Sequence, residues 1–198
     1  VTVMIQVTVA APSSITYSTS SFTLTKDVAI TAVTPTSSGG AVTSWSISPT
    51  LPAGLAFSTT DGTVSGTPTE ISGSTSYTVT ATNLGGSSTA TLTVQVNDVA
   101  PSSIAYSPSF LTLTKDTAMV AATPTSSGGA VTSWSISPSL TAGLSLDGST
   151  GEISGTPTLT SSAVTYTVTA TNTGGSSTAT VTVLVNDAAP TSVSYSPS

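Results

Sequence analysis

The sequence predicts an all-β protein made of tandem antiparallel β-sandwich modules. Four observations support this prediction. A repeat of 89 residues runs through most of the 198-residue chain. Apolar and polar residues alternate in several short runs, as they do in half-buried strands. No window has the apolar spacing of an amphipathic helix. Thr and Val, which favour strands over helices, are abundant throughout.

The repeat is defined by residues that recur 89 positions apart, such as Pro12 and Pro101 or Trp45 and Trp134. When the two copies are aligned without gaps, 61 of 89 positions are identical. Self-similarity at a fixed period is typical of tandem arrays. A unit of this length is large enough to form its own core, unlike the short repeat of a solenoid.

This alignment divides the chain into two complete repeats with a partial repeat at each end. Residues 3–7 align with residues 92–96, so the first segment is interpreted as a last strand. The predicted parts are residues 1–11 (last strand of a preceding repeat), 12–100 (first repeat), 101–189 (second repeat) and 190–198 (first strand of a following repeat).

Several runs in each repeat predict strands. In the first repeat they are residues 15–17, 22–24, 28–33, 45–47, 77–81 and 89–96. The last run alternates without a break, and a Gly-containing connection at residues 83–86 indicates a hairpin before it. Roughly seven short strands in about 90 residues are typical of a β-sandwich. We expect Trp45 and Trp134 to lie in the two cores.

Both repeats carry the same set of short motifs. They are Pro-Ala-Gly-Leu at 52–55, Gly-Thr-Val-Ser-Gly-Thr-Pro at 62–68 and Tyr-Thr-Val-Thr-Ala-Thr-Asn at 77–83, with close counterparts at 142–146, 151–157 and 166–172. This combination resembles the putative Ig domain of prokaryotic surface proteins, which is related to dystroglycan-type cadherin-like modules. The resemblance covers the whole chain and implies Ig-like or cadherin-like sandwiches. It also implies an extracellular or cell-surface location, where such modules usually serve as spacers or stalks.

Composition excludes several classes of function. The chain has no His and no Cys, two Lys and eight acidic residues. It therefore lacks an imidazole base and a thiolate nucleophile. Two cations cannot neutralise a run of phosphates, so we expect no nucleic-acid partner. No apolar stretch approaches the roughly 20 residues that span a bilayer, so we expect no direct membrane insertion.

The remaining catalytic candidates are weak. A Ser nucleophile could use only Lys26 or Lys115 as its base, and each precedes an Asp at a strand end, which indicates a turn. Paired carboxylates could hydrolyse glycosides. However, the acids of each copy (Asp61 and Glu70, or Asp147 and Glu152) have no acidic counterpart in the other copy. We therefore expect no enzyme and no catalytic residues.

A calcium site is the one metal hypothesis. Residues 96–101 and 185–190 are similar to the second half of the D-x-N-D-x-x-P linker by which cadherin modules bind calcium. The candidate ligands are Asn97, Asp98, Asn186 and Asp187. The acid that the motif places before them is replaced by Gln95 and Leu184. Calcium takes six to eight oxygens, so an Asn-Asp pair that caps a turn before Pro is the favoured interpretation. No other cofactor is expected.

The aromatic residues and the hydroxyl-bearing residues indicate which contacts the modules make with one another and with other molecules. Tyr17, Tyr106 and Tyr195 recur beside the junction prolines and are expected to pack between modules. Outward strand positions carry Ser or Thr, of which the chain has 38 and 43, where most proteins carry charges. Since edge charges normally prevent strands of different molecules from pairing, we expect lateral or end-to-end self-association. N-glycosylation is not encoded, because no Asn begins an N-x-S/T sequence.

The sequence thus predicts a non-catalytic structural module of an extracellular repetitive surface protein: a stalk, fibre or filament, sheath or adhesin spacer. Its expected partners are neighbouring repeats of the same chain and other copies. A further hypothesis is that residues 1–9 and 190–198 complete sandwiches of neighbouring subunits. The alternative is a ligand-binding adhesin or carbohydrate-binding module, calcium-stabilised, with a glycan or surface ligand.

Overall fold

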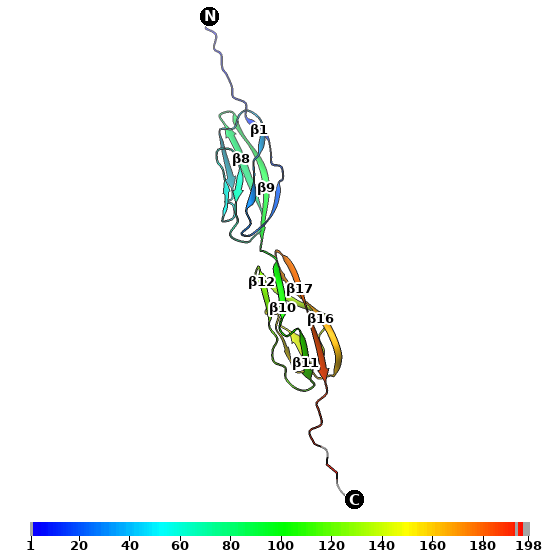
Figure 1. Ribbon diagram of the computed structural model, residues 1–198. Helices are drawn as coiled ribbons and strands as arrows, with labels where there is room; N and C mark the ends of the chain where they lie inside the picture. Colours follow the sequence, from blue (N-terminus) through cyan, green and yellow to red (C-terminus); the bar gives the residue numbers. More distant parts are fainter. Residues whose placement is uncertain (1, 193, 196–198) are drawn as a thin grey trace. The chain divides into compact units, whose positions relative to one another are not determined.

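The computed structural model describes residues 2–192 and 194–195, and its ordered elements are all strands (Figure 1). The all-β prediction is confirmed. The chain divides into two compact units between Asp98 and Val99. Val99 belongs to the second unit, and its carbonyl accepts a hydrogen bond (2.7 Å) from Asn172 of that unit. Among the described residues, no helix is long and apolar enough to cross a membrane.

Unit 1 contains nine strands within the described residues. They are β1 (Pro12–Thr16), β2 (Ser21–Thr25), β3 (Ile30–Val33), β4 (Thr36–Gly39), β5 (Ser44–Ser48), β6 (Leu55–Phe57), β7 (Val64–Gly66), β8 (Ser72–Asn83) and β9 (Gly86–Asn97). They pair as a four-stranded sheet in the order β2-β9-β8-β5, a three-stranded sheet in the order β3-β7-β6, and the pair β1-β4. The runs that the alternation predicted correspond to β1, β2, β3, β5, β8 and β9.

Unit 2 repeats this plan with one difference. Its strands are β10 (Pro101–Tyr106), β11 (Phe110–Thr114), β12 (Pro124–Gly128), β13 (Ser133–Ser137), β14 (Leu144–Leu146), β15 (Ile153–Gly155), β16 (Ser161–Asn172) and β17 (Gly175–Asn186). Where unit 1 has β3, unit 2 makes a single bridge between Ala122 and Ile153. The β-branched Ile30 and Val33 are replaced there by Met119 and Ala122, which favour a strand less.

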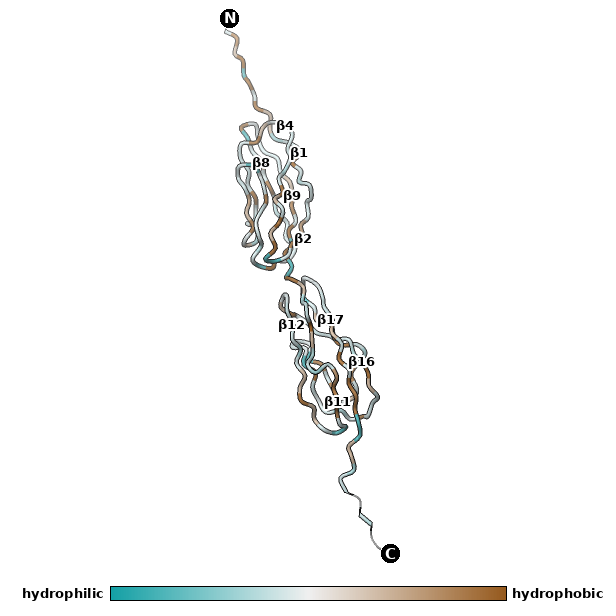
Figure 2. Tube along the Cα trace, in the orientation of Figure 1, coloured by the Kyte–Doolittle hydropathy of each residue, from teal (hydrophilic) through white to brown (hydrophobic). Residues whose placement is uncertain are grey.

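The long hairpins β8-β9 and β16-β17 form the centre of each unit. Along β9 the side chains of Leu92, Val94 and Val96 are almost completely buried, and Thr93 and Gln95 between them are only half-buried. The predicted alternation is therefore confirmed. Most of the chain has neutral to hydrophobic hydropathy, and strongly hydrophilic positions are few (Figure 2). Each core is thus covered mainly by hydroxyl side chains.

One strand pair in each unit runs parallel, a departure from the antiparallel pairing that the sequence predicts. β2 pairs with β9 from Ser21↔Thr93 to Thr25↔Asn97, and β11 pairs with β17 in the same way. The reason is the course of the chain, which leaves the β1-β4 pair after Thr16 and joins the other sheet at Ser21. The alternation of apolar and polar residues shows which face of a strand is buried, but it does not show whether the strand runs parallel or antiparallel to its neighbour.

Residues 2–11 form no strand in this structure. Val3, Met4, Ile5 and Val7 are 76%, 91%, 85% and 86% exposed. Residues 190–192 and 194–195 also lie outside strands, while residues 193 and 196–198 fall outside the described part of the chain. The assignment of both ends to neighbouring repeats therefore stays a prediction.

Candidate functional site

The shared motifs build scaffold contacts. In unit 1 the Pro-Ala-Gly-Leu and Gly-Thr-Pro motifs lie side by side, because the amides of Thr67 and Thr69 donate to the carbonyls of Gly54 (3.0 Å) and Ala53 (2.9 Å). Gly54 has a φ of +86°, and an added Cβ would lie 2.0 Å from the carbonyl oxygen of Thr67. Glycine is therefore required here. Gly-Thr-Pro ends a strand, since β7 stops at Gly66.

The acidic residues Asp61 and Asp147 hold turns closed. A carboxylate oxygen of Asp61 accepts a hydrogen bond from the amide of Thr63 (3.0 Å), and one of Asp147 accepts from the amides of Ser149 (2.7 Å) and Thr150 (2.9 Å). Hydrogen bonds lower the pKa of both carboxyls. The largest effect comes from the Ser58 hydroxyl for Asp61 and from the Thr150 amide for Asp147. A glycosidase acid needs the opposite shift. This geometry suits turn capping.

The calcium candidates lie where the last strand of each unit ends. Asn97 is the last residue of β9, and its Oδ1 accepts a hydrogen bond from Gln95 Nε2 (2.8 Å). Asn186 ends β17 and is exposed, and Asp187 Oδ1 accepts from the amide of Ala188 (3.0 Å). Asp98 borders a surface hollow of about 460 Å³.

These candidates do not make up a calcium ligand set by themselves. Within residues 2–192 and 194–195, no three His, Cys, Asp or Glu side chains gather as a metal-binding group. Calcium takes six to eight oxygens, several of them carboxylate. Lys26 and Lys115 stand in the turns after β2 and β11 and pair with the adjacent Asp27 (3.5 Å) and Asp116 (3.7 Å). The calcium hypothesis stays a prediction.

Tyr17 and Tyr106 belong to the cores of their own units, so the expectation that they pack between modules is wrong for both. The Tyr17 hydroxyl donates to the carbonyl of Gly62 (2.7 Å), and the Tyr106 hydroxyl donates to the carbonyl of Gly151. Burial raises the pKa of each phenol to about 12, and for Tyr17 the charge of Asp61 adds to this effect. Tyr195 is exposed.

The same glycines touch the tryptophans. Trp45 and Trp134 are buried, as predicted. Gly62 has a φ of +76°, and an added Cβ would lie 2.8 Å from Cδ2 of Trp45. Gly151 is related to Trp134 in the same way, at 2.6 Å. The glycine turn thus covers the indole and offers its carbonyl to the tyrosine.

A buried asparagine in each unit fastens the chain segment that enters the unit. Asn83 Nδ2 donates to the carbonyls of Ala10 (2.7 Å) and Ala41 (3.1 Å), and its Oδ1 accepts from the amide of Gly85 (2.7 Å). We call this arrangement the asparagine clamp. Three separate segments meet at one side chain: the entering chain, the loop before β5 and the β8-β9 hairpin.

Unit 2 repeats the clamp. Asn172 Nδ2 donates to the carbonyls of Val99 (2.7 Å) and Ala130 (3.1 Å), and Oδ1 accepts from Gly174 (2.8 Å). Sequence reasoning missed this role. The signal was present, since Asn83 follows Tyr77, Val79 and Ala81 in phase and so occupies an inward-facing position of a strand.

The parallel pairs connect the two ends of each unit. In unit 1, β2 lies near the beginning of the unit and β9 ends it. Backbone hydrogen bonds flank the paired residues on both sides, from Thr93 to Ser20 (2.7 Å) and from Lys26 to Asn97 (2.8 Å). The corresponding bonds of unit 2 run from Thr182 to Ser109 and from Lys115 to Asn186, both 2.8 Å.

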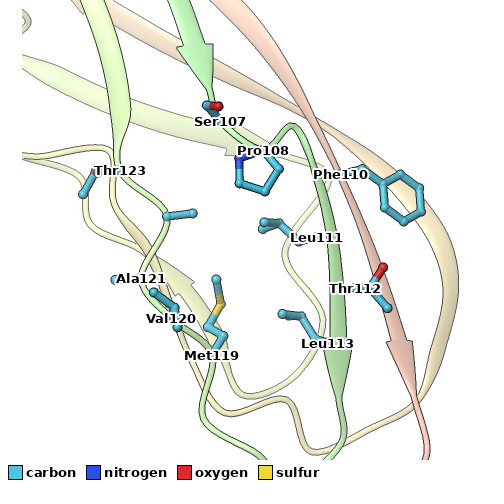
Figure 3. A pocket seen from close by; sticks show the side chains of 11 residues that line it. Ser107, Pro108, Phe110, Leu111, Thr112, Leu113, Met119, Val120, Ala121 and Thr123 are labelled. Atoms are coloured by element: carbon cyan, nitrogen blue, oxygen red, sulfur yellow. The ribbon is translucent and has the colours of Figure 1, made fainter.

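Unit 2 also contains an apolar slot of about 380 Å³ between β11 and residues 119–123. Figure 3 shows Leu111 and Leu113 pointing into the slot from β11, with Met119 and Val120 on the opposite side. Unlike these leucines, Phe110 and Thr112 point away (Figure 3). No charged residue lines the slot.

The architecture defines the chain as a tandem protein of Ig-like β-sandwich domains. A family model described as "Putative Ig domain" matches residues 2–97 and, a second time, residues 100–186. The chain therefore belongs to the putative Ig domain family, whose domains are generally non-catalytic. A search of curated proteins found no match.

Solved structures with Ig domains share the fold. The extracellular domains 3–5 of Drosophila OTK are 17% identical with a TM-score of 0.51, and the match covers 90% of this chain and 60% of that one. The eight N-terminal Ig domains of Down Syndrome Cell Adhesion Molecule isoform 1.30.30 are 12% identical with a TM-score of 0.54, covering 91% and 25%. The chain thus spans about three fifths of the first relative, and the likeness shows a shared Ig-like fold.

Proposed function

We propose that the two units are non-catalytic structural modules of an extracellular surface protein, and that they carry tension along the chain of a stalk, fibre, sheath or adhesin spacer. The observation that carries this proposal is the parallel pairing of β2 with β9 and of β11 with β17.

Parallel pairing determines how a unit responds to a pull on its two ends. A force that draws the chain out before β2 and after β9 pulls these two strands in opposite directions along their own axes. All the hydrogen bonds between them are then loaded together. In an antiparallel hairpin pulled at its two open ends, the bonds load one after another. A parallel pair that joins the first and last parts of a unit therefore resists extension as a group.

The asparagine clamp adds to this resistance. The carbonyl of Ala10 lies in the segment that enters unit 1, and Asn83 binds it to the β8-β9 hairpin. Asn172 binds Val99 at the start of unit 2 in the same way. A force applied to the entering segment is thus transmitted to the central hairpin before it acts on β1 or β10.

The composition and the structurally similar proteins support an extracellular location and a non-catalytic role. Ig-like tandem domains of this kind resemble those of cell-surface proteins. Hydroxyl-covered strands without His or Cys suit a spacer better than an active site. Antibody labelling of intact source cells, with and without permeabilisation, tests the location: labelling only after permeabilisation would contradict it.

The alternative function, ligand binding, has one observation in its favour, the apolar slot of unit 2. A glycan, the ligand that the sequence suggested, is recognised by exposed aromatic rings together with polar groups. Both tryptophans are buried. A glycan array with and without calcium tests this alternative directly.

Single-molecule force spectroscopy tests the mechanical proposal. The 198-residue chain, held at its two ends, should unfold in two steps of nearly equal length. In Lys26→Pro, the amide that binds the Asn97 carbonyl is missing. We expect a lower unfolding force for one unit and an unchanged force for the other. Lys26→Ala, which keeps the amide, is the matched control and should unfold like the parent chain.

The proposal is wrong if Lys26→Pro and the parent chain unfold at equal force. Lys115→Pro provides the same test for unit 2, since the Lys115 amide binds the carbonyl of Asn186. Equal sensitivity of both units to either substitution would also contradict the proposal.

A further inference from the structure

We infer that the apolar slot of unit 2 is a binding site for a small uncharged molecule that carries an aromatic ring. The ring lies between β11 and residues 119–123, and a polar group of the molecule lies at the end of the slot where Ser107 and Thr123 stand (Figure 3). This inference is independent of the proposed mechanical function, because it concerns the interior of one unit and not the way force passes along the chain.

Comparison of the two units shows what the slot lacks. Leu111 and Ala122 line the slot. Unit 1 has the larger Phe22 and Val33 at the aligned positions. Phe22 is buried in the core of unit 1, and Val33 packs against that core. At the place where unit 1 buries a phenyl ring of its own, unit 2 therefore has an open slot of about 380 Å³.

Other differences between the two cores do not make up for this loss of side-chain volume. Ile153 is larger than Val64 of unit 1 by one methylene group. Val181 is smaller than Leu92 of unit 1 by the same amount. Large-to-small differences in a core leave open space wherever the surrounding structure cannot collapse.

Backbone hydrogen bonds hold both walls of the slot in place. One wall is β11, which pairs with β17 along its whole length. On the other wall, the Met119 amide donates to the carbonyl of Gly155 (3.0 Å). Ala122 and Ile153 exchange two further backbone hydrogen bonds of 2.9 Å each. Because the walls are bonded to strands of different sheets, closing the slot would break these bonds. The slot is thus preformed, as ligand pockets usually are.

The lining favours an aromatic ring. Met119 stands where unit 1 has Ile30, and it lies across the slot from Leu111 and Leu113 (Figure 3). A thioether sulfur makes favourable contacts with aromatic rings. Relative to unit 1, unit 2 thus lacks a ring in its own core and has gained a side chain that packs well against one.

The slot also favours an uncharged ligand. No charged residue lines it, and the ammonium group of Lys115, just beyond β11, is paired with Asp116 (3.7 Å). A carboxylate among these apolar side chains would lose its hydration without gaining a countercharge. Ser107 and Thr123 are exposed and offer hydroxyl groups to one polar group of the ligand. A few polar groups of this kind orient a ligand in an otherwise apolar pocket.

NMR of the methionine methyl groups tests the site in the intact chain. The chain has two Met, so isotope labelling of their methyl groups gives one signal from the slot and one from Met4, which is 91% exposed. Benzyl alcohol is the probe. Its ring should shift the Met119 signal upfield in a saturable way and leave the Met4 signal unchanged. Absence of a saturable shift at Met119, or equal shifts of both signals, would overturn the inference.

Substitutions that restore the residues of unit 1 provide the second test. Leu111→Phe and Ala122→Val should each weaken the binding of benzyl alcohol about tenfold or more, because they fill the space that the ring occupies. Val181→Leu restores a residue of unit 1 at a buried position outside the slot and should bind like the parent chain. Hydrogen exchange in β16 and β17 shows that each variant is folded. Undiminished binding by both slot variants would contradict the inference.

The charge of the probe gives the third test. Benzoate has the same ring as benzyl alcohol but carries a carboxylate, and we expect it to bind at least about tenfold more weakly to a slot without a cation. Equal affinities of benzoate and benzyl alcohol would mean that the ring binds elsewhere on the chain.

Discussion

Replacement of Asn83 by Ala should destabilise unit 1 and leave unit 2 unchanged. The substitution removes three hydrogen bonds, to the carbonyls of Ala10 and Ala41 and from the amide of Gly85. Each such bond contributes about 0.5–1.5 kcal/mol, and polar groups left buried without a partner add to the cost. We therefore expect the free energy of unfolding of unit 1 to fall by about 2–4 kcal/mol.

Asn83→Asp separates the donor from the acceptor function of this side chain. The carboxylate keeps an acceptor for the Gly85 amide, but it places negative oxygens against the carbonyls of Ala10 and Ala41. At neutral pH, where the carboxyl is ionised, the Asn83→Asp variant should therefore have a lower free energy of unfolding than the Asn83→Ala variant. Since these carbonyls raise the pKa of the carboxyl in the folded state, stability should recover as the pH falls and the carboxyl is protonated.

Urea titration with hydrogen-exchange mass spectrometry measures each unit separately. Peptides from β8-β9 report unit 1, and peptides from β16-β17 report unit 2 in the same sample. Asn172→Ala, which removes the equivalent bonds of unit 2, should reverse the pattern. If Asn83→Ala shifts unit 1 by less than about 0.5 kcal/mol, the size of an ordinary surface substitution, the clamp is not a stabilising contact.

Two further predictions concern the cores. Gly62→Ala should lower the free energy of unfolding by about 2–4 kcal/mol, because the φ of Gly62 is +76° and an added Cβ would lie 2.8 Å from Trp45. Urea denaturation measures this effect, and Gly73→Ala is the control, because the space around an added Cβ is open there. Equal losses of stability in the two variants would contradict the predicted clash with Trp45. Because the pKa values of Tyr17 and Tyr106 are raised to about 12 from an ordinary 10.0, their contribution to stability is complete below pH 10 and is lost as the pH rises toward 12. An absorbance titration of the chain and of its Tyr→Phe variants measures this, and full ionisation of both phenols near pH 10 would refute it.

Local burial made the strands predictable from the sequence. In β9, each residue's face follows from its own polarity, so the inward positions of Leu92, Val94 and Val96 could be assigned without any knowledge of the partner strands. The core positions of Trp45 and Trp134 followed from the same reasoning. The turn at Gly54 was also predictable, because its residue type reports backbone conformation.

Features that depend on the meeting of distant segments were not predictable in this way. The parallel direction of β2 against β9 is set by a crossing between sheets, and no residue in either strand reports it. Tyr17 was assigned to a module junction because of its nearness to Pro12 in sequence, yet its hydroxyl binds Gly62, which is 45 residues away. The slot of unit 2 required a comparison of side-chain volumes at positions that only the fold brings together.

The differences between the two repeats support a division of roles within each unit. Residues 34–49 are identical to their counterparts in unit 2, and so are residues 77–83 and 85–91, which include the clamp asparagine and most of the central hairpin. The substitutions that open the slot, by contrast, lie within residues 22–33. Because β2 and β3 are edge strands of their two sheets, side chains of this segment can change without altering the hydrogen bonds between the long strands. A repeat can thus keep the residues that resist extension while its edge strands vary, which is why we propose mechanical resistance for both units.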